Sequence, residues 1–254
     1  MDITKVIKKF KISKLILMIS IFIDTVLLVL FVFDILFVDK YKFVSSEIIV
    51  SSLFIIFILI TIFDILLINH TFKKLNNYAN TLAKPYTFDI SARGMESIYK
   101  ESNFVSIFEH VFLNKIEFEK EGIKFIKADI NFVKDEKESS YAKFYAFTTK
   151  KIFKEVYYTN HSLFVKTLSD YHLDALGNTN MYTKEEDSIE KQVEFSSCFF
   201  IGFRGNTIYY IDFNKKIFNL EKDLTSNELF QKYIETEVGE AIENFNKVYA
   251  LRKE

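Results

Sequence analysis

Three aspartates lie inside two long apolar stretches of this chain, and their chemistry needs an explanation. Residues 15–38 contain Asp24 and Asp34, and residues 48–69 contain Asp64. A charged side chain near the centre of a lipid bilayer costs about 2.5–3.5 kcal/mol on insertion scales, so such residues usually face protein or water. If these stretches cross a membrane, each aspartate needs a polar partner or a route to the surface.

Asp24 is the deepest of the three. In antiparallel neighbouring helices its depth matches that of Thr61, which predicts a hydrogen bond between the two side chains with Asp24 able to stay protonated. Asp64 lies towards the inner end of its stretch, near Lys73 and Lys74. The candidate intramembrane polar residues are therefore Asp24, Thr61 and Asp64. They could fix the structure of the helix pair, or they could relay protons or ions in an oligomer, because two helices alone cannot enclose a pathway.

No catalytic, cofactor-binding or metal site is predicted elsewhere. The four histidines form no HxxxH or HExxH pair, and the chain has a single cysteine, so the spacing provides no metal site. His161 and His172 lie in polar segments, where we expect them to be solvated. Cys198 has apolar neighbours, so we expect it to be buried. No glycine-rich phosphate-binding motif occurs, and we therefore expect no cofactor.

Two membrane-spanning helices are predicted to position the aspartates. Residues 15–38 and residues 48–69 each reach or exceed the roughly 20 residues that a helix needs to cross the hydrocarbon core. Neither alternates with the period of a strand. Residues 39–47 form a short turn between them. Lysines are concentrated before the first stretch and after the second, so the positive-inside rule places both termini in the cytoplasm.

Residues 1–14 form a basic N-terminal segment with two interpretations. Ile3, Val6, Ile7 and Phe10 recur at helical spacing, which predicts a short amphipathic helix on the inner membrane surface. Alternatively, the segment is a disordered basic tail that only sets topology. A signal peptide is less favoured, because the apolar run is longer than a typical signal core and no small-residue cleavage site follows it.

The rest of the chain is predicted to be a helical extension followed by an α+β domain. Residues 70–90 continue the second helix with apolar residues at helical spacing, and Pro85 marks its end. Part of this extension, residues 76–84, could instead be a linker. Residues 91–254 form the cytoplasmic domain, and Ser91 is expected to cap a short helix at its start.

An antiparallel sheet is predicted within this domain. Every second residue from Ile126 to Phe132 is apolar, which is typical of a half-buried strand with its other face in solvent. Residues 198–213 are predicted to form a hairpin that turns at Arg204-Gly205-Asn206. Residues 217–220 could extend the sheet, and residues 169–191 are typical of a polar loop or weak helix.

A long amphipathic helix is predicted near the C-terminus. Thr225 and Glu228 match a capping box. An apolar stripe follows at helical spacing, and we expect it to pack on the sheet. The stripe consists of Phe230, Ile234, Val238, Ala241, Ile242, Phe245, Val248 and Tyr249.

Composition limits the classes of partner. The net charge of the whole chain is −1, and residues 69–254 carry 26 basic and 28 acidic side chains. Nucleic acid is therefore not expected as a partner, because binding phosphates requires clustered lysine and arginine. The single cysteine excludes an intrachain disulfide framework and fits a reducing compartment.

Three segments carry a resemblance to a known family. They are YTFDISARGMESIYKESNF at residues 86–104, IEFEKEGIKF at residues 116–125 and GNTIYYIDFNKKIFNL at residues 205–220. With the two preceding spans, this order resembles a bacterial two-span membrane protein family known only as a domain of unknown function. The family's single-residue motif positions are matched by Gly94, Ser102, Phe104 and Phe218. Its last strand and its last helix are matched by residues 208–211 and 227–248. The resemblance implies a protein of the bacterial inner (cell) membrane, a cytoplasmic α+β domain and a small membrane protein as partner.

Three functions remain open from the sequence. The leading hypothesis is a non-enzymatic, membrane-anchored interaction or scaffold protein that presents its domain at the inner membrane. Its expected partners are the lipid bilayer and either another protein or a second copy, through the transmembrane hairpin. The alternatives are a homo-oligomeric transport or channel component that uses Asp24, and an unrecognised membrane-bound enzyme.

Overall fold

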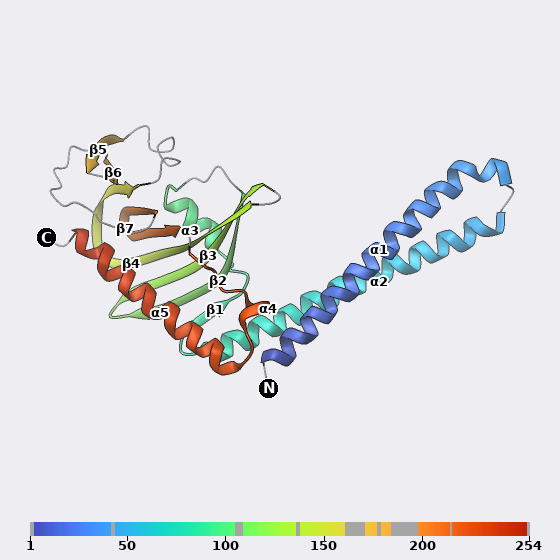
Figure 1. Ribbon diagram of the computed structural model, residues 1–254, viewed down its shortest axis with the longest axis horizontal. Coiled ribbons are helices and arrows are strands. Elements are labelled where there is room, and N and C mark those ends of the chain that lie inside the picture. The colour runs from blue at the N-terminus through green and yellow to red at the C-terminus, as the bar shows by residue number, and fades with distance from the viewer. Residues whose placement is uncertain are drawn as a thin grey trace. The chain divides into compact units, whose positions relative to one another are not determined.

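The chain forms two compact units, Met1–Tyr78 and Ala79–Glu254. The structure, a computed structural model, describes residues 3–41, 44–104, 109–135, 138–160, 171–176, 179–183, 198–213 and 215–252. The first unit consists of long helices, and the second contains a seven-stranded antiparallel sheet and a long C-terminal helix (Figure 1). The fold is therefore α+β, as the sequence predicts.

Two helices of 39 residues each dominate the first unit: α1 (Ile3–Tyr41) and α2 (Val44–Leu82). Neither contains a glycine or proline, so nothing in the sequence interrupts them. Both are long and apolar enough to cross a membrane, by length and composition. At 1.5 Å per residue each measures about 58 Å, roughly twice the hydrocarbon thickness. The helices therefore run beyond the predicted spans and occupy most of the predicted turn at residues 39–47.

The start of α1 and the end of α2 bear on the predictions for residues 1–14 and residues 76–84. The helix α2 ends at Leu82, three residues before Pro85, so most of residues 76–84 is helix rather than linker. The basic segment is helical from Ile3 and continuous with the first apolar stretch. Its apolar stripe is buried, and Phe10 packs on Phe72 with ring centroids 5.6 Å apart. The segment is therefore a helix rather than a disordered tail, and its place at the membrane surface stays a prediction.

The sheet begins with a meander of consecutive strands. Its strand order is β1-β2-β3-β4-β6-β5, and β7 pairs with β4. The turn between β2 and β3 has Glu121 and Gly122 at φ +55° and +74°, the positive values that a tight hairpin turn uses. The strands are β1 (Thr87–Asp89), β2 (Glu109–Lys120), β3 (Ile123–Asp135), β4 (Glu138–Thr159), β5 (His172–Leu176), β6 (Thr179–Thr183) and β7 (Phe199–Phe213).

The strand β7 folds back on itself. Gly205 lies at its centre with φ +59°, and the Phe213 amide donates to the Cys198 carbonyl at 3.0 Å, so the two ends of β7 meet. The predicted hairpin at residues 198–213 is therefore confirmed. Its second arm pairs with the first half of β4 (Ala142 with Phe213), and its first arm with the second half (Thr159 with Phe200). The two halves of β4 thus flank the hairpin within the sheet.

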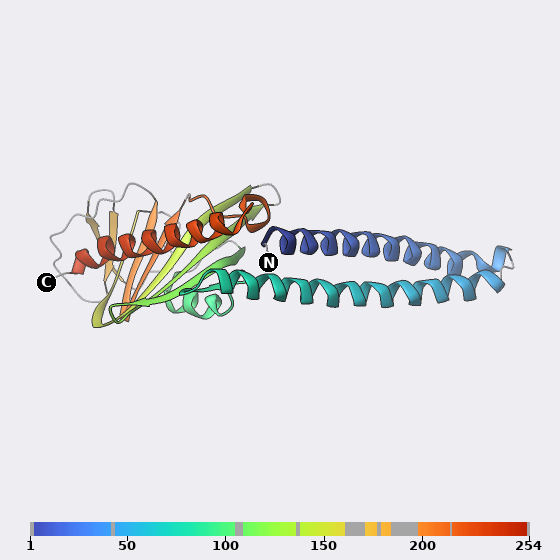
Figure 2. The ribbon, with the colours of Figure 1, turned by 90° about the horizontal axis from the view of Figure 1, so that it is seen from below.

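Helices cover both faces of the sheet. On one face lies α3 (Met95–Glu101), where Tyr99 packs on Phe112 and Phe144. The other face is covered by α5 (Asn227–Tyr249), which lies across the strands (Figure 2). Phe245 of α5 packs on Phe125 and on Phe147, and the predicted C-terminal helix on the sheet is confirmed.

Several local predictions were wrong. The cap of α3 is Gly94 rather than Ser91, and the cap of α5 is Ser226, whose hydroxyl accepts from the Leu229 amide, rather than Thr225. Residues 217–220 do not extend the sheet, because the chain leads there into the short helix α4 (Leu220–Asp223). A short 3-10 turn, η2 (Ala250–Arg252), follows α5.

The segment at residues 169–191 was predicted to be a loop or weak helix, and this is wrong for its described part. The strands β5 and β6 occupy it, and β6 pairs with the second half of β4. In β6, Met181 and Tyr182 are buried. Short apolar runs between polar residues gave no clear period here, so pairing with β4 decided the structure. His161 lies outside the described residues.

Candidate functional site

The predicted polar residues of the helical unit form two pairs. The Thr61 hydroxyl donates to the Asp24 Oδ2 atom, so the hydrogen bond expected from their depth is present. The Ser20 hydroxyl donates to the Asp64 Oδ2 atom at 2.6 Å, and Asp64 is buried. In each pair an acid on one helix meets a hydroxyl on the other. The intramembrane role of these residues stays a prediction.

Ser20 is a partner that the sequence reading missed. The sequence placed Asp64 near Lys73 and Lys74 at the inner end of its stretch, and the structure shows that its carboxylate accepts a hydrogen bond from the other helix. The register that aligns Asp24 with Thr61 also aligns Ser20 with Asp64, and this signal was available. Within the described part of the helical unit, one buried side-chain atom has no hydrogen-bond partner, and this atom is Asp24 Oδ1.

A second polar cluster lies in the sheet domain, where the sequence predicted none. The alternation from Ile126 to Phe132 places Lys127 and Asp129 on the opposite face, and we expected solvent there. This is wrong: Lys127 is 1% exposed and Asp129 is fully buried. Their face of β3 is covered by α5, so the strand is buried on both sides.

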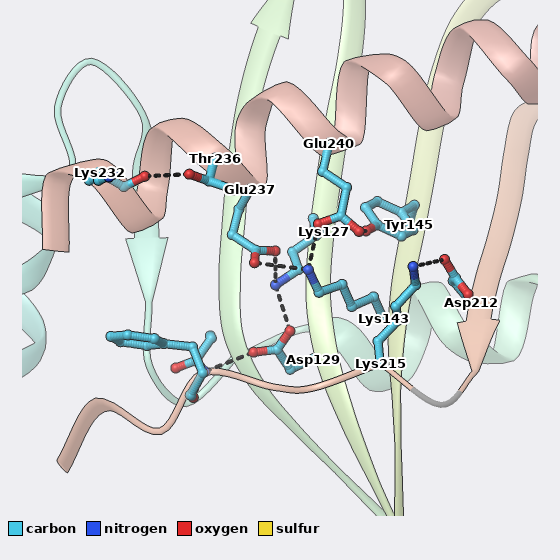
Figure 3. Close-up of polar contacts among 12 residues, drawn as sticks. Lys127, Asp129, Lys143, Tyr145, Asp212, Lys215, Lys232, Thr236, Glu237 and Glu240 are labelled. Atoms are coloured by element: carbon cyan, nitrogen blue, oxygen red, sulfur yellow. Dashed lines mark hydrogen bonds and ion pairs between the residues drawn. The ribbon is translucent and has the colours of Figure 1, made fainter. Parts of the chain in front are cut away.

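Lys127 is the centre of this cluster (Figure 3). Its Nζ atom lies 2.5 Å from Asp129 Oδ1, on its own strand, and 2.6 Å from Glu237 Oε2, on α5. Glu237 also contacts Lys143 of β4, with Nζ and Oε1 2.9 Å apart. Glu237 therefore lies between two lysines from adjacent strands.

Further contacts extend this network towards the surface. Lys143 Nζ lies 2.6 Å from Glu240 Oε2, and the Tyr145 hydroxyl donates to Glu240 Oε1 at 3.2 Å. At the other end, the Asn114 amide group donates to Asp129 Oδ2 and to the Phe218 carbonyl, both at 2.8 Å. We call Asn114, Lys127, Asp129, Lys143, Tyr145, Glu237 and Glu240 the charge network.

Burial and pairing set the protonation of the network. The neighbouring Asp129 and Glu237 carboxylates raise the pKa of Lys127 despite its burial. The two lysines lower the pKa of Glu237 although burial opposes this. Burial raises the pKa of Asp129 more than its bonds to Lys127 and Asn114 lower it. Burial also raises the pKa of Tyr145 well above its ordinary value, so it stays a hydrogen-bond donor.

The network supports a structural role better than proton transfer. An acid or base must reach the proton that it transfers, yet Lys127 and Asp129 lie under α5 with almost no exposed surface. Their charges are matched by each other and by Glu237 at close contact. The arrangement therefore fixes the position of α5 on β3 and β4.

A smaller polar cluster surrounds Glu155 on β4. Its Oε1 atom accepts from the hydroxyls of Tyr157 and Tyr171 at 2.7 and 3.0 Å and from the Asn103 amide at 3.3 Å. Arg204, at the turn of β7, donates to the Glu101 carbonyl at 2.7 Å. These contacts tie the β7 turn to the end of α3, and sequence spacing gave no sign of them.

The remaining candidate residues do not converge. His110 contacts Glu96 at 3.3 Å and packs on Tyr99, whereas Cys198 is only half-buried, and burial raises the pKa of its thiol. His172 begins the strand β5 rather than lying in a loop. Among the described residues, no group of three histidine, cysteine or acidic side chains could hold a metal ion.

Comparison with known proteins gives no relative. No protein-family model, no curated protein and no solved structure matches the chain. The resemblance to a bacterial two-span family of unknown function therefore stays a prediction.

Proposed function

We propose that this chain is a membrane-anchored, non-enzymatic interaction or scaffold protein of the bacterial inner (cell) membrane. The helices α1 and α2 form the anchor, and the sheet domain is presented on the cytoplasmic side. The lipid bilayer is the first partner, and another protein or a second copy of the chain is the second.

The apolar surface of the two helices carries this proposal. Large side chains project from both, and Met18, Phe22 and Phe63 are 68%, 68% and 64% exposed. Exposing apolar surface to water costs about 25 cal/mol for each Å². A continuous apolar surface around two helices is therefore expected to be buried against lipid or protein. Lipid provides this burial, and the matched hydroxyl–carboxyl pairs are the arrangement that polar groups need in lipid.

The sheet domain supports a binding role over catalysis. Its described polar clusters are occupied by contacts within the fold: the charge network positions α5, and the Glu155 cluster positions the β7 turn. Both faces of the sheet are filled by aromatic side chains. A domain whose interior is filled in this way is suited to presenting its outer surface to a partner.

Crosslinking in native membranes tests this proposal. Cells that express the full chain are treated with a membrane-permeant amine crosslinker, and the protein is then purified in detergent. We expect a reproducible crosslinked species that contains either a second protein or a second copy. A chain that stays monomeric across a range of crosslinker concentrations would contradict the scaffold role.

A second candidate function is proton-linked transport by an oligomer. The unmatched Asp24 Oδ1 atom favours it, because acidic residues in membrane spans mark ion and proton pathways and the helix pair satisfies only one oxygen of this acid. The test is ion or proton flux in liposomes that contain the purified chain. A flux that is present with the native chain and vanishes in Asp24→Ala supports transport. Absence of ion or proton flux with the native chain excludes the transport function.

A further inference from the structure

One strongly basic surface of the helical unit has no role in the contacts described above. Lys5, Lys8 and Lys9 of α1 and Lys73 and Lys74 of α2 are all exposed. We call these five residues the basic collar. None of the five makes an ion pair with another residue in the described part of the chain.

The contacts of the helix pair place Lys9 and Lys73 at one level, and the other three lysines lie within four residues of these two. Phe10 and Phe72 pack on each other, so the turn of α1 that carries Lys9 lies beside the turn of α2 that carries Lys73. The apolar stripe of α1, which includes Val6 and Phe10, is buried. At 100° per residue, Lys5, Lys8 and Lys9 lie on the opposite face of the helix and are directed outwards.

No acid offsets this charge within its own segments. Residues 3–23 and 65–78 contain no aspartate or glutamate. Elsewhere in the chain basic and acidic residues are nearly balanced, and the lysines of the charge network lie within contact distance of carboxylates. The collar is therefore a local excess of positive charge that its own helical segments do not neutralise.

The collar also lies at the edge of the apolar stretches. Lys9 precedes the first stretch by six residues, and Lys73 follows the second by four. At 1.5 Å per residue these intervals are about 9 and 6 Å, close to the roughly 5–7 Å depth of one lipid headgroup layer. A lysine side chain can bridge the remaining distance, since its long stem lies along apolar surface while the ammonium group stays in the polar layer.

We propose that the basic collar binds the anionic headgroups of the lipids around the helix pair. This inference rests on the proposed membrane anchor and adds the class of lipid. Phosphate-bearing headgroups with a net negative charge have the complementary chemistry, whereas zwitterionic headgroups leave the excess charge unmatched. The energy of one lysine near an anionic surface corresponds to about a fivefold enrichment of the anionic lipid.

Spin-labelled lipids test the proposal on the full chain. The protein is reconstituted into phosphatidylcholine vesicles that contain traces of spin-labelled phosphatidylglycerol or spin-labelled phosphatidylcholine. The fraction of each label immobilised at the protein gives their relative association. We expect a several-fold preference for phosphatidylglycerol that falls towards one as salt is raised, because salt screens exposed charges.

Two variants locate the preference. The first variant combines Lys5→Gln, Lys8→Gln, Lys73→Gln and Lys74→Gln. We expect it to lower the preference for phosphatidylglycerol at least about threefold. Free inorganic phosphate should leave this preference unchanged in the native chain. The matched control changes four exposed lysines of the sheet domain and should keep it. This control combines Lys120→Gln, Lys150→Gln, Lys216→Gln and Lys222→Gln.

The outcomes separate this inference from the membrane anchor. Equal association of both labels with the native chain at low salt overturns the collar proposal while leaving the anchor intact. Equal losses in the two variants also overturn it. Failure of the chain to immobilise either label, or its release from the vesicles, counts against the anchor itself.

Discussion

Replacing Lys127 with methionine should destabilise the sheet domain strongly. Lys127 Nζ lies 2.5 Å from Asp129 and 2.6 Å from Glu237, and none of the three side chains is more than 9% exposed. Water therefore cannot replace the missing ammonium group. Removing one partner of a buried ion pair costs about 3–5 kcal/mol, and we expect Lys127→Met to lower the free energy of unfolding by that amount.

The control for this prediction lies on the same strand. Lys124 pairs with Glu117 at 2.5 Å, but its side chain is 51% exposed. An exposed pair contributes at most about 1 kcal/mol, so Lys124→Met should cost no more than that. Urea unfolding of the full chain in detergent micelles, followed by circular dichroism, measures both variants. Equal losses of unfolding free energy for Lys127→Met and Lys124→Met would refute the argument that burial makes the ion pairs of the charge network stabilising.

A double variant tests the cause of the loss. The double variant Lys127→Met/Asp129→Leu removes both members of the ion pair on β3. Glu237 still forms its ion pair with Lys143, and the Asn114 amide still donates to the Phe218 carbonyl. Replacing a buried ion pair by apolar side chains of similar volume is often neutral. We therefore expect the double variant to recover most of the stability that Lys127→Met loses. A double variant as unstable as the single one would show that lost packing, rather than an unpaired charge, is responsible.

Three further predictions follow from single groups. The pKa of Glu237 is lowered from its ordinary 4.5, so its contribution is present above that pH and is lost as pH falls through the folded value; Glu237→Gln should flatten the acid limb of a stability–pH curve, and an unchanged limb counts against this. The pKa of Lys127 is raised from 10.5, so its contribution is present below that pH and is lost as pH rises through the folded value; Lys127→Met should flatten the alkaline limb, and a limb that stays as steep counts against this. Gly202→Ala places a Cβ atom 2.9 Å from a buried tyrosine ring and should cost about 1–3 kcal/mol in urea unfolding, whereas a neutral effect means that the ring can shift.

The contact between the helices gives one more prediction. Asp24→Asn keeps an oxygen that can accept from Thr61, so membrane insertion and assembly should match those of the native chain, as measured by membrane extraction and crosslinking. Loss of assembly in this variant would show that the acid acts between copies rather than within one hairpin.

Patterns with a clear period predicted the main elements. The apolar stripe of α5, the strand around Ile130, the hairpin at Gly205 and the two long helices all follow from spacing and turn chemistry. The contact between Asp24 and Thr61 was predicted because the two residues lie at the same depth in antiparallel helices. These features depend on residues close in sequence or on a register fixed by one turn, and for that reason a single sequence reveals them.

The charge network was missed because alternation describes one face of a strand and says nothing about what covers the other. A signal was nevertheless present: Glu237 lies between Ile234 and Ala241 at the spacing of the α5 stripe, so its side chain falls on the buried face. An acid in that position predicts a cation opposite. Which lysines face it depends on how α5 lies over β3 and β4, and that arrangement is set by packing across the whole domain.

The placement of the two helices in a membrane is the central claim, and cysteine labelling tests it most directly. After Cys198→Ala, a single cysteine is introduced at Ser46, between the apolar stretches, or at Lys216, which is exposed in the sheet domain. A membrane-impermeant maleimide is then applied to intact spheroplasts and to permeabilised cells. We predict labelling at position 46 in both and at position 216 only after permeabilisation. Labelling of both positions, or of neither, in intact spheroplasts would contradict the anchor and its orientation.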